Sequence, residues 1–213
     1  MVSAISERRF SAAALSHAMA GLRDAPDTDD VVLPVPKTEM PTQWQRDKLN
    51  NLRVAAILVA FCEAADGTTQ VVLTERAHHL PAHPGQISFP GGAREPHDVT
   101  LADVALREAE EEVGLDRASV NVLGYLRPQW TISGYSMTPV VGFVDHVPEL
   151  TADPSEVASV FCVPADYLFD TANHVQSVRE YAGRQFPVAE IRWGRHRIWG
   201  ATAHVVTRLM KVI

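Results

Sequence analysis

The chain has 213 residues, of which 46% are hydrophobic, and its formal net charge is −7 at pH 7. This length and composition predict one domain of ordinary size with a full hydrophobic core. The acidic balance and the lack of a long basic run exclude nucleic acid and an anionic membrane surface as expected partners. A polyanionic substrate would therefore need a metal ion or a few arginines at its binding site.

The first part of the chain predicts an N-terminal helical arm and connector, residues 1–50, ahead of a main domain that spans 51–213. Met1 to Leu22 has the pattern of one amphipathic helix, and Asp24 to Lys37, rich in proline and aspartate, predicts an exposed connector. The role of the arm cannot be derived from its residues.

Nothing at the N-terminus has the pattern of a signal peptide. The longest apolar run, Val54 to Cys62, is far too short to span a bilayer. We expect Cys62 and Cys162, which lie in apolar segments, to be reduced core thiols. These observations together predict a soluble, cytoplasmic protein.

Apolar periodicity and turn signals place the regular elements of the main domain. Strands are expected at Arg53–Phe61, Gln70–Arg76, Val120–Leu126, Met137–Val144, Glu156–Val163 and, around Gly194, Ile191–Ile198. The first two strands form a hairpin through Asp66-Gly67. Helices are expected over an acidic segment that ends at Gly114, over Ala165–Phe169, and over Gly200–Val212 with Ala201, Val205, Leu209 and Val212 facing inward. Mixed strands with a helix between and a helix after them predict an α/β/α sandwich.

The acidic helix concentrates negative charge in Glu108, Glu110, Glu111 and Glu112. Like charges one turn apart destabilise a helix by about 0.2–0.5 kcal/mol per pair. Divalent metal is a natural reason for such a pattern, because Mg²⁺ takes carboxylate and phosphate oxygens as ligands. The alternative is an ordinary surface helix with a solvated acidic face.

Helical spacing separates these glutamates. The stripe that packs on the core is formed by Ala102, Ala105, Leu106, Ala109 and Val113. Glu108 and Glu112 are one turn apart beside this stripe, so both can reach one ion. Glu111 is the next position round, and Arg107, one turn before it, is expected to pair with it. Glu110 lies on the other flank and is interpreted as a solvated charge.

The segment from Gly92 to Leu115 resembles the Nudix box, G-x5-E-x7-R-E-U-x-E-E-x-G-U. The matching residues are Arg107, Glu108, Ala109, Glu111, Glu112, Gly114 and Leu115. Asp98 stands where the box has its first glutamate, and one extra residue separates it from Arg107. Such a spaced match behind a Gly-Gly turn is far more specific than a lone glycine motif.

The resemblance implies a Nudix α/β/α fold and hydrolysis of a pyrophosphate with Mg²⁺ or Mn²⁺. Glu108 and Glu112, with Glu111, would hold the metal, and a backbone carbonyl near Gly91 or Gly92 would add a ligand. Glu111 or Glu112 would take the proton of the attacking water. Glu156 resembles the downstream glutamate that some members use as base or extra ligand, with a surface residue at a strand start as the alternative.

The loop before the box suggests the substrate. Leu73-Thr-Glu-Arg76-Ala77 and Gly85-Gln-Ile-Ser-Phe89-Pro-Gly-Gly92 resemble the signature of the coenzyme A pyrophosphatase branch. Pro81 stands where that signature has its second arginine. His78, His79 and His83 lie nearby and either replace that charge or face solvent as ordinary loop histidines.

Downstream, Ser133-Gly-Tyr135 and Trp199-Gly-Ala-Thr-Ala203 also resemble this branch. Trp130 and Tyr135 are candidates to stack on an adenine, with ordinary packing as the alternative for each. Arg76, Gly91, Gly92 and Tyr135 are thus expected to bind substrate.

Three functions remain open from the sequence. The first is hydrolysis of coenzyme A to 4′-phosphopantetheine and adenosine 3′,5′-bisphosphate. The second is Nudix hydrolysis of a nucleotide sugar, a dinucleotide or a damaged nucleotide, which Pro81 favours. The third is a non-catalytic Nudix-like binding module, which the retained glutamates disfavour. The oligomeric state is also open, with a homodimer as one arrangement considered.

Overall fold

The computed structural model describes residues 9–33, 49, 51–181 and 184–213. Its main sheet contains β1 (Arg53–Glu63), β2 (Thr69–Arg76), β3 (Ile87–Ser88), β4 (Gly91–Ala93), β5 (Asn121–Tyr125), β6 (Gln129–Trp130), β7 (Tyr135–Val144) and β8 (Val157–Pro164). A smaller sheet contains β9 (His174–Tyr181), β10 (Arg184–Trp193) and β11 (His196–Trp199). The helices are α2 (Ala12–Ala18), α4 (Leu101–Val113), α5 (Ala165–Leu168) and α6 (Ala201–Leu209), with 3-10 turns at Ala20–Leu22, Arg117–Ser119 and Thr171–Asn173.

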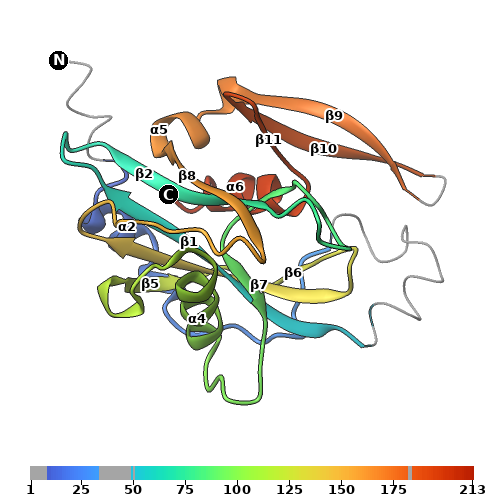
Figure 1. Cartoon of the computed structure of the whole chain (residues 1–213), viewed down its shortest axis with the longest axis horizontal. Helices are drawn as coiled ribbons and strands as arrows, with labels where there is room; N and C mark the ends of the chain where they lie inside the picture. The colour runs from blue at the N-terminus through green and yellow to red at the C-terminus, as the bar shows by residue number, and fades with distance from the viewer. Residues whose placement is uncertain (1–8, 34–48, 50, 182–183) are drawn as a thin grey trace.

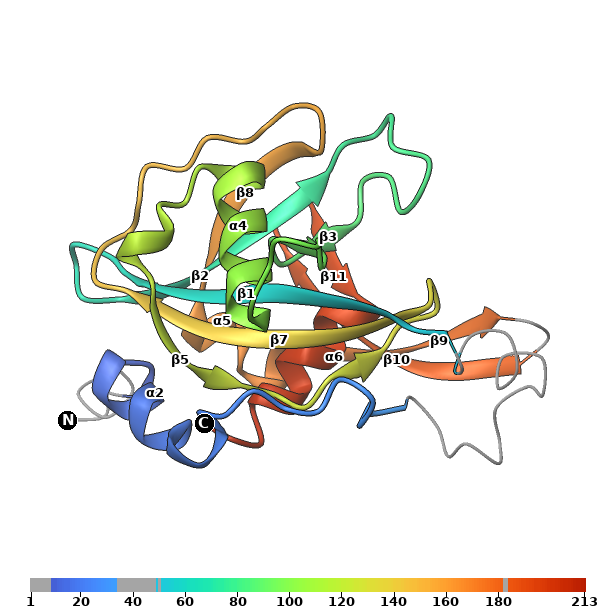
Figure 2. The ribbon, with the colours of Figure 1, turned by 90° about the horizontal axis from the view of Figure 1, so that it is seen from below.

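Strand β1 is the centre of the main sheet. It runs parallel to β7 from Arg53 opposite Tyr135 onward, and antiparallel to β2 as the predicted hairpin. The sheet is therefore mixed. Helix α4 covers one face and α5 and α6 lie on the other, while the hairpin of β9 and β10 extends along one side (Figure 1, Figure 2). This is the α/β/α arrangement that the periodicity predicts.

Two hydrophobic cores lie on the two faces of the sheet, and β1 contributes to both. Ile57, Val59 and Phe61 belong to the core under α5 and α6, whereas Leu58 and Ala60 belong to the core under α4. Successive side chains of a strand point to opposite faces, so a strand buried on both sides reads as a continuous apolar run. The apolar run of β1 is explained by this double burial.

The described part of the N-terminal arm packs on the main sheet. Phe10, Leu15 and Met19 are buried in the same core as Phe61. Phe10 stacks on Phe61 with ring centroids 6.3 Å apart. Further along, Val32 forms a parallel bridge with Gln129 beside β6.

The structure corrects several expectations about elements. The single helix expected over residues 1–22 is shorter where it is described, because Ser11 caps a new helix whose first residue is Ala12 and a 3-10 turn follows it. Residues 31–33 of the expected exposed connector are half-buried against Trp130, and residues 34–37 lie outside the described residues. Ala201 is exposed instead of facing inward, because it is the first residue of α6.

Strand β9 has no counterpart among the predicted elements, and it sits at the edge of the smaller sheet. Within the described residues, no helix combines the length and the apolar character that crossing a membrane requires.

Candidate active site

Helix α4 is bounded by strong local signals. Thr100 accepts from the backbone N–H of Asp103, and the Asp103 carboxylate accepts from the backbone N–H of Thr100 in return. This reciprocal capping box satisfies two N–H groups that the first turn leaves free. At the other end Gly114 adopts φ 68°, a left-handed conformation that glycine takes without strain. These signals set where α4 begins and ends, and its buried apolar residues set which side faces the sheet.

Asp98 and Arg107 form a buried ion pair at the start of the site. Arg107 donates from Nε and Nη2 to the two Asp98 oxygens, each at 3.0 Å, and from Nη2 to the carbonyl of Ala93 at 3.1 Å. The hydrogen bonds from Arg107 hold the pKa of Asp98 below its ordinary value. The pair thus ties the turn between Ala93 and Asp98 to α4. The sequence pairs Arg107 only with Glu111, so the Asp98 contact was missed, although the box position of Asp98 was a signal for it.

Glu108 lies against the glycine turn. A Cβ atom added to Gly92 would be 2.4 Å from a Glu108 carboxylate oxygen, so any larger residue would displace that carboxylate from its present position. Burial raises the pKa of Glu108, and its hydrogen bond from Arg107 Nη1, at 2.9 Å, opposes that rise. Glycine at position 92 thus allows the Glu108 carboxylate to lie directly against the backbone of the turn.

Glu112 is the most deeply buried glutamate of the helix, with 4% of its surface exposed. Its carboxylate accepts from the backbone N–H of Gly91 at 3.1 Å. Its pKa is raised to about 8. Burial is the main cause, the charges of Glu108 and Glu156 add to it, and the Gly91 hydrogen bond and the Arg76 charge oppose it. A positive charge beside this buried carboxylate would stabilise its ionised form and lower its pKa.

Gly91 is also fixed by sterics. A Cβ there would be 2.4 Å from the Ala56 carbonyl oxygen, and Gly91 has φ 152°. The turn can therefore approach β1 only as glycine.

The outer glutamates differ from the inner pair. Glu111 is exposed and accepts from Arg107 Nη1 at 2.9 Å, as the spacing predicts. Glu110 is exposed and pairs with Arg117 at 2.8 Å instead of standing free in solvent. The turn after Gly114 brings Arg117 back to the helix, which spacing within the helix alone could not reveal.

Glu156 belongs to a loop that packs on the C-terminal end of α4. The N–H groups of Thr151 and Asp153 bond to the carbonyls of Val113 and Glu112, each at 2.9 Å. The Glu156 side chain is exposed, and its charge acts on Glu108 and Glu112. The structure thus brings Glu156, 44 positions after Glu112 in the numbering, to the side of the inner glutamates.

The expected substrate residues occupy different surroundings. The Arg76 charge acts on Glu112, and Arg76 Nε is buried without a hydrogen-bond partner in the described part of the chain. Tyr135 is half-buried at the start of β7, with the Arg53 guanidinium 4.2 Å from its ring centroid. Trp130 is buried, 7% exposed, in a small apolar cluster, so its ring is not free to stack on a base.

The histidines near Pro81 have separate partners. His78 faces Glu75 at 3.4 Å, and His79 Nε2 bonds to the Ser155 carbonyl at 3.1 Å. His83 is exposed with φ 57°, and Pro81 is also exposed.

The two free cysteines are Cys62, which is buried, and Cys162, which is half-buried.

The inner carboxylates suit a hard divalent cation. Glu108 and Glu112 are desolvated oxygen donors one turn apart, beside a turn whose backbone approaches closely. Among the described residues no three Asp, Glu, His or Cys side chains converge closely enough to hold an ion as they stand. Glu108 and Glu111 both bond to Arg107, so a cation there would compete with that guanidinium for them.

Comparison with known proteins shows the family of this chain. The NUDIX domain family model matches residues 52–182. The protein named "Uncharacterized Nudix hydrolase NudL" from Photorhabdus laumondii subsp. laumondii is 34% identical over 175 residues, which are 82% of this chain and 92% of that protein. The protein of the same name from Yersinia enterocolitica is 34% identical over 163 residues, 76% of this chain and 83% of its own length. A crystal structure of a Nudix hydrolase from M. smegmatis, RenU, is 25% identical with a TM-score of 0.47, covering 54% of this chain and 71% of that chain.

The class of protein is therefore a hydrolase that acts on the pyrophosphate linkage of a nucleoside diphosphate derivative. The chain belongs to the Nudix family. Nudix hydrolases generally use divalent ions such as Mg²⁺ or Mn²⁺, and the carboxylate oxygens of Glu108 and Glu112 are donors of the type that such ions take.

Proposed function

We propose that this enzyme hydrolyses coenzyme A or its derivatives to 4′-phosphopantetheine and adenosine 3′,5′-bisphosphate. The substrate assignment is supported by the resemblance of the loop from Leu73 to Gly92 to the coenzyme A pyrophosphatase signature. The chemistry is supported by one observation above all. The buried Glu112 carboxylate accepts from the N–H of Gly91 and bonds to no arginine in the described part of the chain, so it is available to a cation.

We assign Glu108 and Glu112, with Glu111, as the residues that hold Mg²⁺ or Mn²⁺. Bound there, the ion would neutralise pyrophosphate oxygens and lower the pKa of a water ligand. Gly91 and Gly92 bring their backbone next to these carboxylates and give the substrate a close approach. Arg107, anchored on Asp98, positions Glu108 and Glu111.

Removal of a proton from the attacking water needs a carboxylate beside the inner pair. Glu111, Glu112 and Glu156 are the candidates. Among the described residues Glu111 bonds to Arg107, whereas neither Glu112 nor Glu156 bonds to an arginine. We expect substitution of the base to flatten the acidic limb of the pH profile of kcat. Comparing the profiles of Glu111→Gln and Glu156→Gln therefore assigns it.

Arg76 and Tyr135 are proposed to contact the substrate. Arg76 Nε is a buried donor without a partner in the described region, and a substrate phosphate would satisfy it. The Tyr135 ring, at the first residue of β7, lies against the Arg53 guanidinium. The proposed partner is this small-molecule substrate in the cytoplasm, with no nucleic acid or membrane. A homodimer is compatible with the proposal, and sedimentation velocity would identify it.

A second substrate class follows from the exposed Pro81, which leaves the signature without its second arginine. His78 and His79 contact Glu75 and Ser155, so neither side chain takes the place of that cation without giving up its contact. Nucleotide sugars, dinucleotides and damaged nucleoside triphosphates are the alternatives.

The deciding experiment incubates the purified protein with Mg²⁺ and coenzyme A, acyl-coenzyme A, ADP-ribose, NADH or dGTP, and separates the products chromatographically. Coenzyme A and its acyl derivatives should turn over fastest. If coenzyme A is untouched while another compound is hydrolysed, the substrate assignment is wrong and the family activity stands. A protein that binds these compounds and hydrolyses none would be a binding module.

A further inference from the structure

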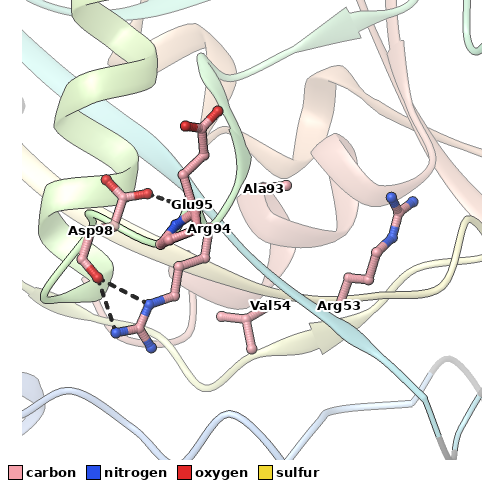
Figure 3. A pocket seen from close by; sticks show the side chains of 7 residues that line it. Arg53, Val54, Ala93, Arg94, Glu95 and Asp98 are labelled. Carbon is pink, nitrogen blue, oxygen red and sulfur yellow. Dashed lines mark hydrogen bonds between the residues drawn. The ribbon is translucent and has the colours of Figure 1, made fainter.

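A cavity of about 500 Å³ lies beside the carboxylates of α4. It is lined by Arg53 and Val54 of β1 and by residues of the turn from Ala93 to Asp98 (Figure 3). No role assigned so far uses Arg53 or Arg94.

The cavity is close to the proposed reaction centre. Ala93, which lines it, directly follows Gly92, and consecutive Cα atoms are about 3.8 Å apart. Gly92 is the residue against which the Glu108 carboxylate lies. If the pyrophosphate of a nucleotide is bound at Glu108 and Glu112, the groups attached to that pyrophosphate can therefore reach the cavity.

Positive charge in this cavity is not neutralised. Arg94 donates from Nε and Nη2 to the backbone carbonyl of Asp98, at 3.3 and 3.1 Å, and from Nη2 to that of Val99 at 2.9 Å. Within the described ranges no carboxylate pairs with Arg94 or Arg53, although the chain has a net charge of −7. Backbone carbonyls orient the Arg94 guanidinium without cancelling its charge.

The carboxylates that line the cavity have other partners. The Asp98 charge is taken up by Arg107 in the buried pair. Glu95 lies 3.6 Å from His97, and in Figure 3 its carboxylate extends away from Arg94. Arg53 and Arg94 therefore each contribute a positive charge to the cavity, and Figure 3 shows their guanidinium groups at opposite ends of it.

Arg53 is exposed, yet its guanidinium is held 4.2 Å from the centroid of the Tyr135 ring. The parallel register of β1 and β7 sets these two residues side by side. A cation–π contact orders the guanidinium and leaves its N–H donors free, because the ring accepts through its face. An ordered planar donor of this kind suits a phosphate oxygen.

We propose that this cavity is an anion subsite that binds a phosphate monoester carried by the substrate away from the hydrolysed pyrophosphate, with Arg53 as the direct contact and Arg94 supporting it. The inference rests on the proposed function and names the part of the substrate that gives specificity. In coenzyme A this group is the 3′-phosphate of the adenosine.

The kinetic test compares coenzyme A with 3′-dephospho-coenzyme A, using wild type, Arg53→Gln, Arg94→Gln and the control Arg117→Gln, whose side chain pairs with Glu110 outside the cavity. Arg53→Gln should raise KM for coenzyme A about tenfold, with kcat and the dephospho substrate unchanged, since one charge-assisted contact is lost. Arg94→Gln should have a smaller effect of the same kind, and Arg53→Lys should recover part of the loss. Equal changes for both substrates, or none, would overturn the proposal.

A binding test separates this inference from the proposed function. Metal-free wild type is titrated calorimetrically with adenosine 3′,5′-bisphosphate and with adenosine 5′-monophosphate. The bisphosphate should bind about tenfold more tightly, and Arg53→Gln should remove that preference. Equal affinities would end the proposal even if coenzyme A is hydrolysed. A preference that depends on Arg53 would support it even if coenzyme A is not the substrate.

Discussion

Two glutamates of this protein are almost equally buried and have opposite electrostatics. Glu112 on α4 has 4% of its surface exposed, and Glu190 on β10 has 3%. Burial raises the pKa of Glu112 to about 8. Hydrogen bonds from Arg197 and Arg192 lower the pKa of Glu190 to about 2.

The difference lies in what covers each carboxylate. Glu190 accepts from Arg197 at 2.6 Å and from Arg192 at 2.9 Å, and both arginine side chains are largely exposed to water. Glu112 accepts from the backbone N–H of Gly91 and, among the residues that the structure describes, bonds to no cationic side chain, although the charge of Arg76 acts on it. A buried carboxylate that is paired with cations can stabilise a fold. A buried carboxylate without such partners costs stability, and carboxylates of this kind are concentrated at functional sites. The comparison supports the proposal that Glu112, and not Glu190, acts in the reaction.

Removing the Glu112 charge should have the largest effect on activity. Glu112→Gln keeps the shape of the side chain and removes the charged ligand, so kcat should fall about 10²–10⁴-fold with Mg²⁺. Steady-state product release measures this loss, and circular dichroism checks the fold. Glu190→Gln is the matched control, and its activity per folded molecule should stay near wild type. Activity near wild type in Glu112→Gln would remove Glu112 from the mechanism.

Breaking the buried pair at Arg107 should have the largest effect on stability. Arg107→Met leaves Asp98 charged and unpaired in the interior, which costs about 3–5 kcal/mol of unfolding free energy. Urea unfolding measures the loss. The double variant Arg107→Met with Asp98→Asn should recover part of it, because no unpaired charge remains. Additive losses in the double variant would contradict the pairing.

Glu190→Gln should destabilise the protein by only about 1 kcal/mol, since its arginine partners are exposed and screened. A loss of this size lowers the melting temperature by about 2–4 °C in a chain of this length. Differential scanning calorimetry at pH 7 measures it. A loss of unfolding free energy as large as that of Arg107→Met would contradict the view that water screens the ion pairs of Glu190 with Arg192 and Arg197.

The pH dependence of stability should separate the two glutamates by sign. The ordinary pKa is 4.5 for both. In metal-free protein the stability that Glu112 contributes is fully present below pH 4.5 and is lost as pH rises through about 8, because its folded pKa is raised. Glu190 contributes stability that is present above pH 4.5 and is lost as pH falls through about 2, because its folded pKa is lowered.

Unfolding in EDTA across this pH range measures both contributions. Relative to wild type, Glu112→Gln should gain stability between pH 5 and pH 8. Glu190→Gln should lose stability above pH 4.5 and approach wild type in stronger acid. The same sign for both variants would refute the comparison.

The sequence predicts much of the fold because buried helices and strands have apolar residues at characteristic spacings. The continuous run of β1, buried on both faces, and the capped helix α4 were both predicted on this basis, and their ends differ from the predicted ends by a few residues. Strand β9 was missed because it is an edge strand whose Val175 and Val178 are exposed. A strand without a buried face has no alternating pattern to detect.

In the candidate site, spacing along one helix predicts contacts within that helix and little beyond it. It separated Glu108 and Glu112 from Glu110, and it paired Arg107 with Glu111. The contact from Arg107 to Asp98 depends on how the preceding turn folds back. The cavity beside Arg53 depends on the parallel register of β1 and β7, which no local pattern specifies.

Mn²⁺ binding tests the central claim most directly, because it reports on Glu112 without requiring the correct substrate. Electron paramagnetic resonance titration should show that Glu112→Gln weakens Mn²⁺ binding at least about tenfold, while Glu190→Gln binds like wild type. Wild-type affinity in Glu112→Gln, or an equal loss in both variants, would contradict the assignment of the buried, uncompensated carboxylate as the metal ligand.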